Sequence, residues 1–182
     1  MKKIRPARLD DAAEMLEIYR PYVLSTAISF EIEPPSLQEF RGRISENIEK
    51  FPWAVCELAG QVVGYAYAGA YKSRCAYAWS VETTVYVHQE FRGQGIGKDL
   101  YCRLLATLKR QGAMNVIAGI ALPNQASVGI HESLGFEKVA QFKDVGFKLG
   151  KWWDVGYWQL QLQKPAEPKA LRSFHDDPQL LA

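Results

Sequence analysis

The sequence is poor in the residue that disulfide-rich and zinc-binding domains depend on. Its 182 residues include three cysteines, Cys56, Cys75 and Cys102. Their number is odd, and their spacing does not match the close pairs that hold a zinc ion. We therefore expect free thiols in a reducing compartment and no metal site.

A strong excess of one charge and a long apolar run are also missing. The chain has 22 Lys and Arg against 20 Asp and Glu, and a net charge of +2 does not indicate nucleic acid or an anionic membrane as a partner. No apolar run approaches the length of a membrane span, and the N-terminal MKKIRPARLDD becomes acidic where a signal peptide becomes apolar. We expect a cytoplasmic protein that binds neither nucleic acid nor membranes.

The overall amino-acid composition is that of a globular domain. Apolar residues make up 48% of the chain, aromatic residues 12% and charged residues 23%, enough for one well-filled core. The segment Lys164 to Ala182 has three prolines, several charges and no hydrophobic periodicity. We therefore expect one domain over residues 1–163, followed by a tail over residues 164–182 that lies on the surface or is poorly ordered.

The stretch Val81 to Lys98, VETTVYVHQEFRGQGIGK, is the most informative part of the chain. Thr83 to Val87 is an unbroken run of β-branched and aromatic residues, which is typical of a buried strand. From Ile96 to Leu108 an apolar residue recurs every four positions, which predicts an amphipathic helix. The strand therefore leads into the helix through a glycine-rich turn.

That turn has the features of an anion-binding loop. Gly93, Gly95 and Gly97 lack the Cβ atoms that would keep a ligand away, and they permit backbone angles that aim N–H groups into one concavity. The start of the helix adds unpaired N–H donors, and Arg92 adds charge. No Gly-Lys-Ser/Thr follows, so the loop is not a P-loop, and its place in the chain does not fit a dinucleotide fingerprint. We expect a bound phosphate or diphosphate; a turn that only caps the helix is the alternative.

Hydrophobic patterns along the rest of the chain predict the architecture. Pro21 is expected to end or bend the first helix, and residues 25–35 are expected to form an ordered loop able to cover a substrate. We predict helices starting near Asp10, Ser36, Ile96 and Gln125, and strands at residues 3–7, 53–58, 62–70, 81–87, 115–122, 136–142 and 152–162.

Two motifs resemble those of the GCN5-related N-acetyltransferase (GNAT) superfamily. Arg92, Gly95 and Gly97 fit its diphosphate loop, Arg/Gln-x-x-Gly-x-Gly/Ala, and a second element reads Asn124-x-x-Ser127-x-x-x-His131-x-x-x-Gly135-Phe136. The superfamily usually has a tyrosine where this chain has His131. The resemblance implies an α/β (α+β) single-domain GNAT fold, with a mixed, mostly antiparallel sheet splayed between two parallel strands and helices on both faces. It also implies acetyl-CoA as co-substrate.

The predicted coenzyme site follows from that fold. Two parallel strands that part leave backbone N–H and C=O groups with which the amide-bearing arm of the coenzyme can pair as an extra strand. Asn124 and Ser127 are placed to bond the arm, although Asn124 is also a suitable helix N-cap. The predicted coenzyme-binding residues are Val85, Tyr86, Val87, Arg92, Gly93, Gln94, Gly95, Ile96, Gly97, Lys98, Asn124 and Ser127.

A closer resemblance, over about Ile4 to Leu162, is to the phosphinothricin and methionine sulfoximine N-acetyltransferases. The strings that carry it are SVETTVYV, LPN, IHESLGF and VGFKLGKWWDV. The resemblance implies direct acetylation of the α-amine of a small amino acid such as phosphinothricin, methionine sulfoximine or methionine sulfone. It also implies herbicide resistance and a homodimer. The charged, proline-containing tail and details of the loop YKSRCAY depart from the family and leave the preferred substrate open.

Glu82 and His131 are the predicted catalytic residues. Glu82 is the candidate base, because apolar neighbours in its strand would raise the pKa of its carboxyl. A structural ion pair of Glu82 with Lys72 or Arg74 is the alternative. His131 is expected to relay a proton to the departing thiolate or to bond the substrate, and the alternative is a satisfied helix histidine that faces the sheet.

The remaining predicted substrate-binding residues lie before and within the central strand. Lys72 and Arg74 are candidates for binding the carboxylate or phosphinate of the substrate, or they are solvated loop cations. Thr83 and Thr84 can donate to substrate oxygens or be plain strand formers. The complete predicted set is Lys72, Ser73, Arg74, Glu82, Thr83 and Thr84.

Two other functions remain open at this stage. One is acetylation of a protein N-terminus, as in ribosomal-protein acetyltransferases, which needs an open groove around Phe30 and Lys72. The other is an acyl-CoA-binding module that has lost catalysis, which the presence of both Glu82 and His131 disfavours.

Overall fold

The computed structural model describes residues 2–164 and 167–174. In chain order the strands and helices are β1 (Lys2–Pro6), α1 (Ala12–Ser25), α2 (Leu37–Ile48), β2 (Trp53–Leu58), β3 (Gln61–Ala70), β4 (Ser80–Val87), α3 (Ile96–Gln111), β5 (Asn115–Leu122), α4 (Gln125–Ser133), β6 (Glu137–Lys148) and β7 (Lys151–Gln161). Short 3₁₀ turns lie at Leu9–Asp11, Cys75–Tyr77 and Gln89–Phe91.

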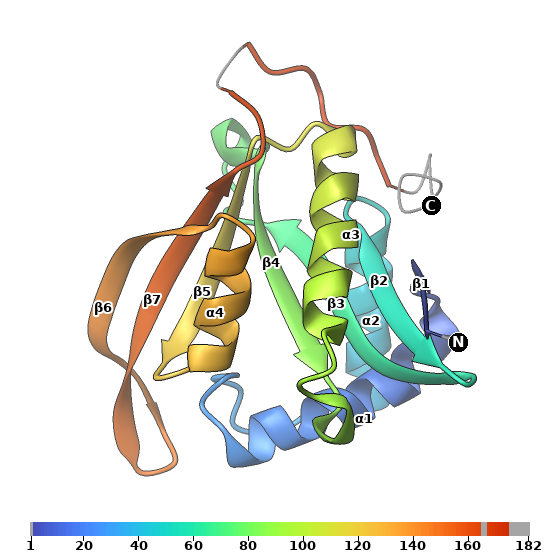
Figure 1. The fold of residues 1–182 in the computed structure, drawn as a ribbon, viewed down its shortest axis with the longest axis vertical. Helices are drawn as coiled ribbons and strands as arrows, with labels where there is room; N and C mark the ends of the chain where they lie inside the picture. Colours follow the sequence, from blue (N-terminus) through green and yellow to red (C-terminus); the bar gives the residue numbers. More distant parts are fainter. Residues whose placement is uncertain (1, 165–166, 175–182) are drawn as a thin grey trace.

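The strands form one sheet in the order β1-β2-β3-β4-β5-β7-β6. Neighbouring strands are antiparallel except β4 and β5, which run parallel. Helices α3 and α4 lie in front of the sheet and α1 and α2 behind it (Figure 1). The predicted mixed sheet with helices on both faces is therefore confirmed.

Each face of the sheet has its own apolar core. On the α3 face, Leu100, Leu104 and Leu108 pack on strand residues that include Val81 and Val116. On the other face, α1 and α2 pack on Tyr65, Tyr86 and neighbouring side chains. The four-residue spacing of apolar side chains in α3 and the alternation of side chains in β4 determine which of them reach each core. Consecutive residues of β4 consequently face opposite cores.

Two segments differ from the sequence prediction. Of the two predicted outcomes, an end or a bend at Pro21, the end is not observed: helix α1 continues four residues beyond Pro21, to Ser25, because Tyr22 and Val23 are buried against the sheet and this burial outweighs the lost backbone hydrogen bond. Strand β6 continues beyond residue 142 to Lys148, with a register shift between Phe142 and Gly146. The turn that joins β6 to β7 is therefore only Leu149-Gly150, both at positive φ.

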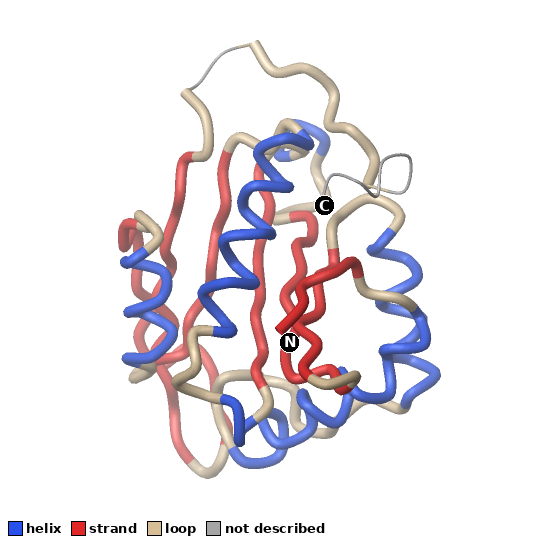
Figure 2. The backbone as a smooth tube through the Cα atoms, turned by 45° about the vertical axis from the view of Figure 1, so that its right-hand side comes forward, coloured by secondary structure: helices blue, strands red, loops and turns tan. Residues whose placement is uncertain are grey.

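The described part of the predicted tail is Lys164 and residues 167–174, of which residues 167–174 cross the end of the sheet and lie near the C-terminal end of α3 (Figures 1 and 2). Gln111 Nε2 donates to Arg172 O at 2.7 Å, and Trp79 Nε1 donates to Lys169 O at 2.6 Å. Phe174 is 3% exposed and belongs to the α3-side core. Residues 165–166 and 175–182 of that prediction lie outside the described residues.

Membrane-spanning helices and metal-binding clusters are absent from the described residues. No helix among them combines the length and the apolar composition that spanning a membrane requires. They also contain no group of three or more His, Cys, Asp and Glu side chains arranged to hold a metal ion.

Candidate active site

The site is built around a gap between the two parallel strands. Strands β4 and β5 pair at only three positions, Ser80↔Asn115, Val81↔Val116 and Glu82↔Ile117, and then diverge. His88 N donates to Val63 O in β3, so the even-numbered residues of β4 bond to β3. The odd-numbered residues, Thr83, Val85 and Val87, consequently direct their N–H and C=O groups into the gap. This edge can accept an extended chain of amides.

The glycine-rich turn lies at the open end of this gap. Gly93 and Gly95 have φ of 75° and 76°, and Gly95 is the N-cap of α3. A Cβ at Gly97 would lie 3.3 Å from Ile130 Cδ1 and 3.7 Å from Val87 Cγ2, so the absence of a side chain here lets the first turn of α3 lie close to β4 and α4. The loop therefore presents bare backbone N–H groups and a helix start, which suit a diphosphate.

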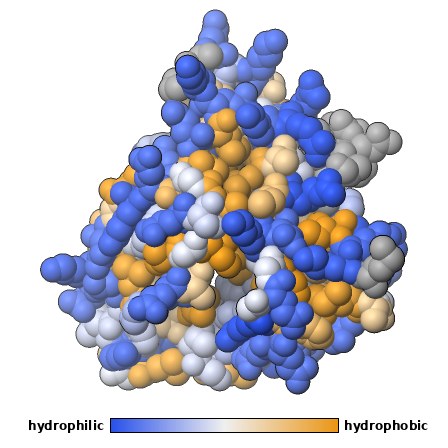
Figure 3. Space-filling model, viewed as in Figure 1, coloured by the Kyte–Doolittle hydropathy of each residue, from blue (hydrophilic) through white to orange (hydrophobic). Residues whose placement is uncertain are grey.

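A cavity of about 530 Å³ extends from this loop into the gap. The space-filling view shows it as a hollow with hydrophobic borders between α4 and the N-terminal end of α3 (Figure 3). Of the predicted coenzyme residues, the cavity brings together Val85, Val87, Arg92, Gly93, Gly95, Ile96, Gly97, Lys98, Asn124 and Ser127. Gln94 and Tyr86 do not line it. The Tyr86 side chain belongs to the core on the α1 side.

Asn124 and Ser127 lie at the start of α4. Asn124 Oδ1 accepts a hydrogen bond from Ser127 N at 3.1 Å, which makes Asn124 the N-cap of this helix. The alternative role of Asn124 as a cap is thus observed, and both side chains line the cavity as well.

His131 is 3% exposed, and both of its ring nitrogens are bonded. Nδ1 lies 2.7 Å from Ser127 O, and Nε2 lies 2.9 Å from the Tyr101 hydroxyl. Because a carbonyl oxygen only accepts, Nδ1 carries the proton, and Nε2 accepts from Tyr101. Burial lowers the pKa of the His131 ring, so the ring is neutral at neutral pH.

Tyr101 is a site residue that the sequence prediction missed. It is 1% exposed in α3, and burial raises the pKa of its hydroxyl well above the usual value. With Thr83, Ser127 and His131 it lines a polar cavity of about 110 Å³ between the diverging strands. Thr83 Oγ1 is buried there and has no hydrogen-bond partner among the described residues. A tyrosine on the buried face of an otherwise aliphatic helix was the available signal in the sequence.

Glu82 lies on the other face of the sheet, with Thr84 and Tyr86. A Cβ atom added to Gly119 of β5 would lie 3.5 Å from Glu82 Oε1 and 3.4 Å from the Tyr157 ring, so both side chains lie over Gly119. The residue as a whole is exposed, yet partial removal of the carboxylate from water raises its pKa. Among the described residues Glu82 makes no ion pair, so the alternative pairing with Lys72 or Arg74 is not observed.

Lys72, Ser73 and Arg74 are exposed in the loop that joins β3 to β4 and line none of the cavities described above. Lys72 Nζ lies 5.3 Å from the centre of the Tyr71 ring. Tyr71 N donates to Ser80 O, which places this loop at the end of β4 that carries Glu82.

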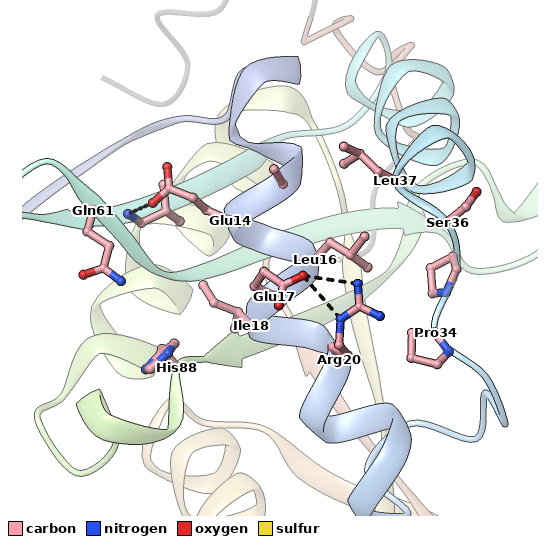
Figure 4. A pocket seen from close by; sticks show the side chains of 13 residues that line it. Glu14, Leu16, Glu17, Ile18, Arg20, Pro34, Ser36, Leu37, Gln61 and His88 are labelled. Carbon is pink, nitrogen blue, oxygen red and sulfur yellow. Dashed lines mark hydrogen bonds and ion pairs between the residues drawn. The ribbon is translucent and has the colours of Figure 1, made fainter.

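A larger hollow, of about 740 Å³, lies along the outer surface of α1 (Figure 4). Its walls include Glu17, Arg20, Pro34 and His88, and Glu17 and Arg20 pair with each other. None of the predicted catalytic, coenzyme-binding or substrate-binding residues lines it. The gap between β4 and β5 is therefore the better candidate for the active site.

Comparison with known proteins agrees with this geometry. The family model described as "Acetyltransferase (GNAT) domain" matches residues 4–156. The chain is 40% identical to a phosphinothricin N-acetyltransferase of Streptomyces viridochromogenes, over 93% of each chain. It is 37% identical to an L-methionine sulfoximine/L-methionine sulfone acetyltransferase of Salmonella typhimurium, over 92% of this chain and 98% of that protein. A Salmonella typhimurium acetyltransferase solved with its cofactor acetyl-CoA superposes with a TM-score of 0.89 at 36% identity, over 93% of this chain and 98% of that one.

Proposed function

The chain belongs to the GNAT acetyltransferase family, and we propose that it transfers acetyl from acetyl-CoA directly to the α-amine of a small amino acid such as phosphinothricin, methionine sulfoximine or methionine sulfone. The family assignment confirms the resemblance found in the sequence, and acetyl-CoA is the expected co-substrate. The substrate class rests on relatives that share between a third and two fifths of their residues with this chain.

One observation carries the proposal. The carboxylate of Glu82, which has no ion-pair partner among the described residues, lies where β4 and β5 separate, on the face opposite to the glycine loop. A thioester that enters along the loop and the gap then presents its acyl carbon near Glu82, while an amine approaches from the α1 face. The two substrates therefore enter the site from opposite faces of the sheet.

The proposed reaction requires two proton movements. Glu82, directly or through water, takes one proton from the substrate ammonium group, and its raised pKa makes it a stronger base than an ordinary carboxylate. The amine nitrogen then forms a bond to the acyl carbon. When the intermediate collapses, the C–S bond breaks. The nitrogen loses its second proton as the thiolate gains one.

His131 contributes through Tyr101 in this proposal. Its Nδ1 proton is directed to Ser127 O and its Nε2 accepts from Tyr101, so the ring has no N–H group to give to the thiolate. The Tyr101 oxygen keeps its lone pairs in the small cavity that the strands enclose, beside Thr83. We assign His131 the role of holding this hydroxyl in place until the thiolate forms; the Tyr101 O–H then turns from His131 Nε2 to donate a hydrogen bond to the sulfur, and the second proton of the nitrogen passes to the sulfur.

The acidic group of the amino acid is proposed to bind near the start of β4. Lys72 and Arg74 supply positive charge there, Ser73 supplies a hydroxyl group from the same loop, and Thr84 supplies one from the sheet face that carries Glu82. Arg74 makes no ion pair among the described residues, so its guanidinium is available to a carboxylate or phosphinate.

We also propose a homodimer and a cytoplasmic location. Strands β6 and β7 and the turn between them expose Phe142, Val145, Phe147, Leu149 and Trp152, each by more than half of its surface. Apolar exposure of this kind is typical of an interface, and a second copy of the chain is the proposed partner. Three free cysteines fit a reducing compartment. Acetylation of phosphinothricin by this enzyme would confer resistance to that herbicide.

The test is acetyl-CoA turnover with a panel of acceptors. Methionine sulfoximine, methionine sulfone and phosphinothricin should be acetylated much faster than a peptide with a free N-terminus. Negligible turnover of all three would contradict the proposed substrate class. Tight acetyl-CoA binding without turnover of any acceptor would support a binding module instead.

A further inference from the structure

Ile28 lies where the two cavities of the site meet. The 530 Å³ cavity and the 110 Å³ cavity share part of their walls, including Val85, Asn124 and His131. Ile28 comes from the loop between α1 and α2 (Figure 1) and also lines both cavities. Among residues 26–36, all of which the structure describes, it is the only one that lines either cavity. The loop therefore borders the site of the thioester through a single residue.

The apolar side chain of Ile28 is not accounted for by the cores of the protein. It is 40% exposed and belongs to neither of the two apolar cores. The small cavity that it borders contains the hydroxyls of Tyr101 and Thr83 on the α3 side of the sheet. Ile28 thus adds an apolar contact on the α1 side of an otherwise polar cavity.

The small cavity has the size of the reacting end of an acetyl thioester. Its volume is about 110 Å³. At roughly 30 Å³ for each water molecule in the liquid, this is room for about four heavy atoms. A sulfur atom, a carbonyl carbon, its oxygen and one methyl group are four heavy atoms. A longer acyl chain would have to extend beyond the cavity, toward Ile28.

Both sides of Ile28 are anchored in the chain. Ile28 N donates to Thr26 Oγ1 at 3.1 Å, and the Thr26 hydroxyl donates to a carbonyl in the last turn of α1. On the other side, Ser29 Oγ lies 2.6 Å from the Tyr19 hydroxyl, and Ser29 O accepts from Lys148 Nζ at 2.6 Å. Lys148 is 4% exposed in β6. The loop is therefore bonded to α1 and to β6, and Ile28 keeps its place when a longer acyl group presses against it.

We propose that Ile28 is a specificity-determining residue that limits the acyl group of the donor to acetyl. It closes the small cavity on the α1 side, so that the methyl of an acetyl group packs against it and a propionyl group meets it. Donor specificity then depends on the loop between α1 and α2, separately from the residues proposed to bind the acceptor. This inference rests on the proposed place of the thioester between β4 and β5.

The test compares acetyl-CoA with propionyl-CoA in the wild type, in Ile28→Val and in Ile28→Ala, with one acceptor throughout. One extra methylene changes kcat/KM by about 10- to 200-fold where a site is filled, and the wild type should prefer acetyl-CoA by a ratio in this range. The ratio should fall at least about threefold in Ile28→Val and to within about threefold of unity in Ile28→Ala. Contacts of the acceptor cancel in each ratio.

Ile32→Ala is the matched control. Ile32 lies in the same loop, is 66% exposed and lines neither cavity, so the substitution should leave the donor preference unchanged. Melting temperatures identify any variant that is not folded. If Ile28→Ala does not fold, Ile28→Val, which lacks only one methyl group, carries the test.

Direct binding by calorimetry needs no acceptor. The wild type should bind propionyl-CoA more weakly than acetyl-CoA, and Ile28→Ala should bind the two equally. The kinetic ratio decides where an acceptor is turned over, and calorimetry decides where none is. Failure of the proposed amino-acid substrates is therefore distinguishable from failure of the role of Ile28.

Two results would overturn the proposal. One is a wild type that uses propionyl-CoA as well as acetyl-CoA, or an Ile28→Ala variant that keeps the wild-type preference. The other is a change in the KM of the acceptor alone with an unchanged donor ratio, which would show that Ile28 contacts the acceptor and not the acyl group.

Discussion

Glu82 combines an exposed position with a carboxylate that has a raised pKa and no ion-pair partner in residues 2–164 and 167–174. We predict that Glu82→Gln lowers kcat/KM by about 10²- to 10⁴-fold, because it removes the base and preserves the shape. The wild-type rate should rise with pH through a limb that lies above the ordinary Glu pKa, and this limb should vanish in the variant. Rate profiles against pH test this. Identical profiles for the two proteins would rule Glu82 out.

The same shift has a consequence for stability. A raised pKa means that the folded state binds the Glu82 proton more tightly than the unfolded state does. The stabilising contribution is therefore present below the unfolded pKa and is lost as pH rises through the folded pKa. Glu82→Gln should be more stable than the wild type at neutral pH but not below the ordinary Glu pKa. Urea midpoints at two pH values measure the difference, and an advantage of the variant at the lower pH would contradict it.

The contribution of the Tyr101 hydroxyl to stability can be measured by removing that single oxygen atom. Tyr101→Phe leaves His131 Nε2 buried without its donor, which should lower the free energy of unfolding by about 1–3 kcal/mol. Urea denaturation checks this. Tyr65→Phe is the matched control, since Tyr65 is equally buried and its hydroxyl makes no hydrogen bond among the described residues. A cost for Tyr65→Phe as large as that for Tyr101→Phe would show that the His131 contact contributes nothing.

At the scale of elements, the loop before α3 depends on left-handed backbone at Gly95. Gly95→Ala should destabilise the protein by about 1–2 kcal/mol and raise the KM for acetyl-CoA, because φ is 76° there. Gly129→Ala is the matched control. Gly129 lies inside α4 with open space at its Cβ, so alanine should stabilise by about 0.4–1 kcal/mol. Urea denaturation and coenzyme kinetics measure both changes, and a stable Gly95→Ala with normal KM would contradict the role of the loop.

Most elements could be predicted from the sequence because period and capping are local signals. The capping box of Ser36 and Glu39 and the four-residue period of α3 are examples. The course of α1 through Pro21 could not be predicted, since it depends on burial of Tyr22 and Val23 against a sheet formed later in the chain. For the same reason the hydroxyl contacts of Tyr22 and Tyr101 could not be predicted: their hydroxyls meet Val87 and His131 only in the folded chain.

At the scale of the whole molecule, the C-terminal segment connects distant parts of the domain. Phe174→Ala should lower the free energy of unfolding by about 3–5 kcal/mol, because Phe174 is 3% exposed within the α3-side core. Urea denaturation checks this. An unchanged midpoint would mean that residues 167–174 are not docked in solution. The exposed neighbour Arg172→Ala is the control, since only its backbone bonds to Gln111.

The proposed dimer makes a prediction at the same scale. Trp152→Glu places a charge on the exposed apolar surface of β6 and β7 and should convert a dimer to a monomer without loss of fold. Sedimentation velocity measures the change. Glu137→Lys, on the same strand pair and also exposed, is a control for altered surface charge. A wild-type protein that sediments as a monomer at micromolar concentration would contradict the proposal.

Only three paired positions connect β4 to β5, so the sheet is nearly two separate halves. A coenzyme bound in the gap would form hydrogen bonds in place of those that β4 and β5 do not make, and it would connect the two halves of the sheet. The coenzyme would then stabilise the fold as well as react. Folding and ligation then become thermodynamically linked. At a concentration one hundred times its dissociation constant, CoA should raise the free energy of unfolding by about 2.7 kcal/mol. Cellular CoA levels would therefore influence the lifetime of the folded protein.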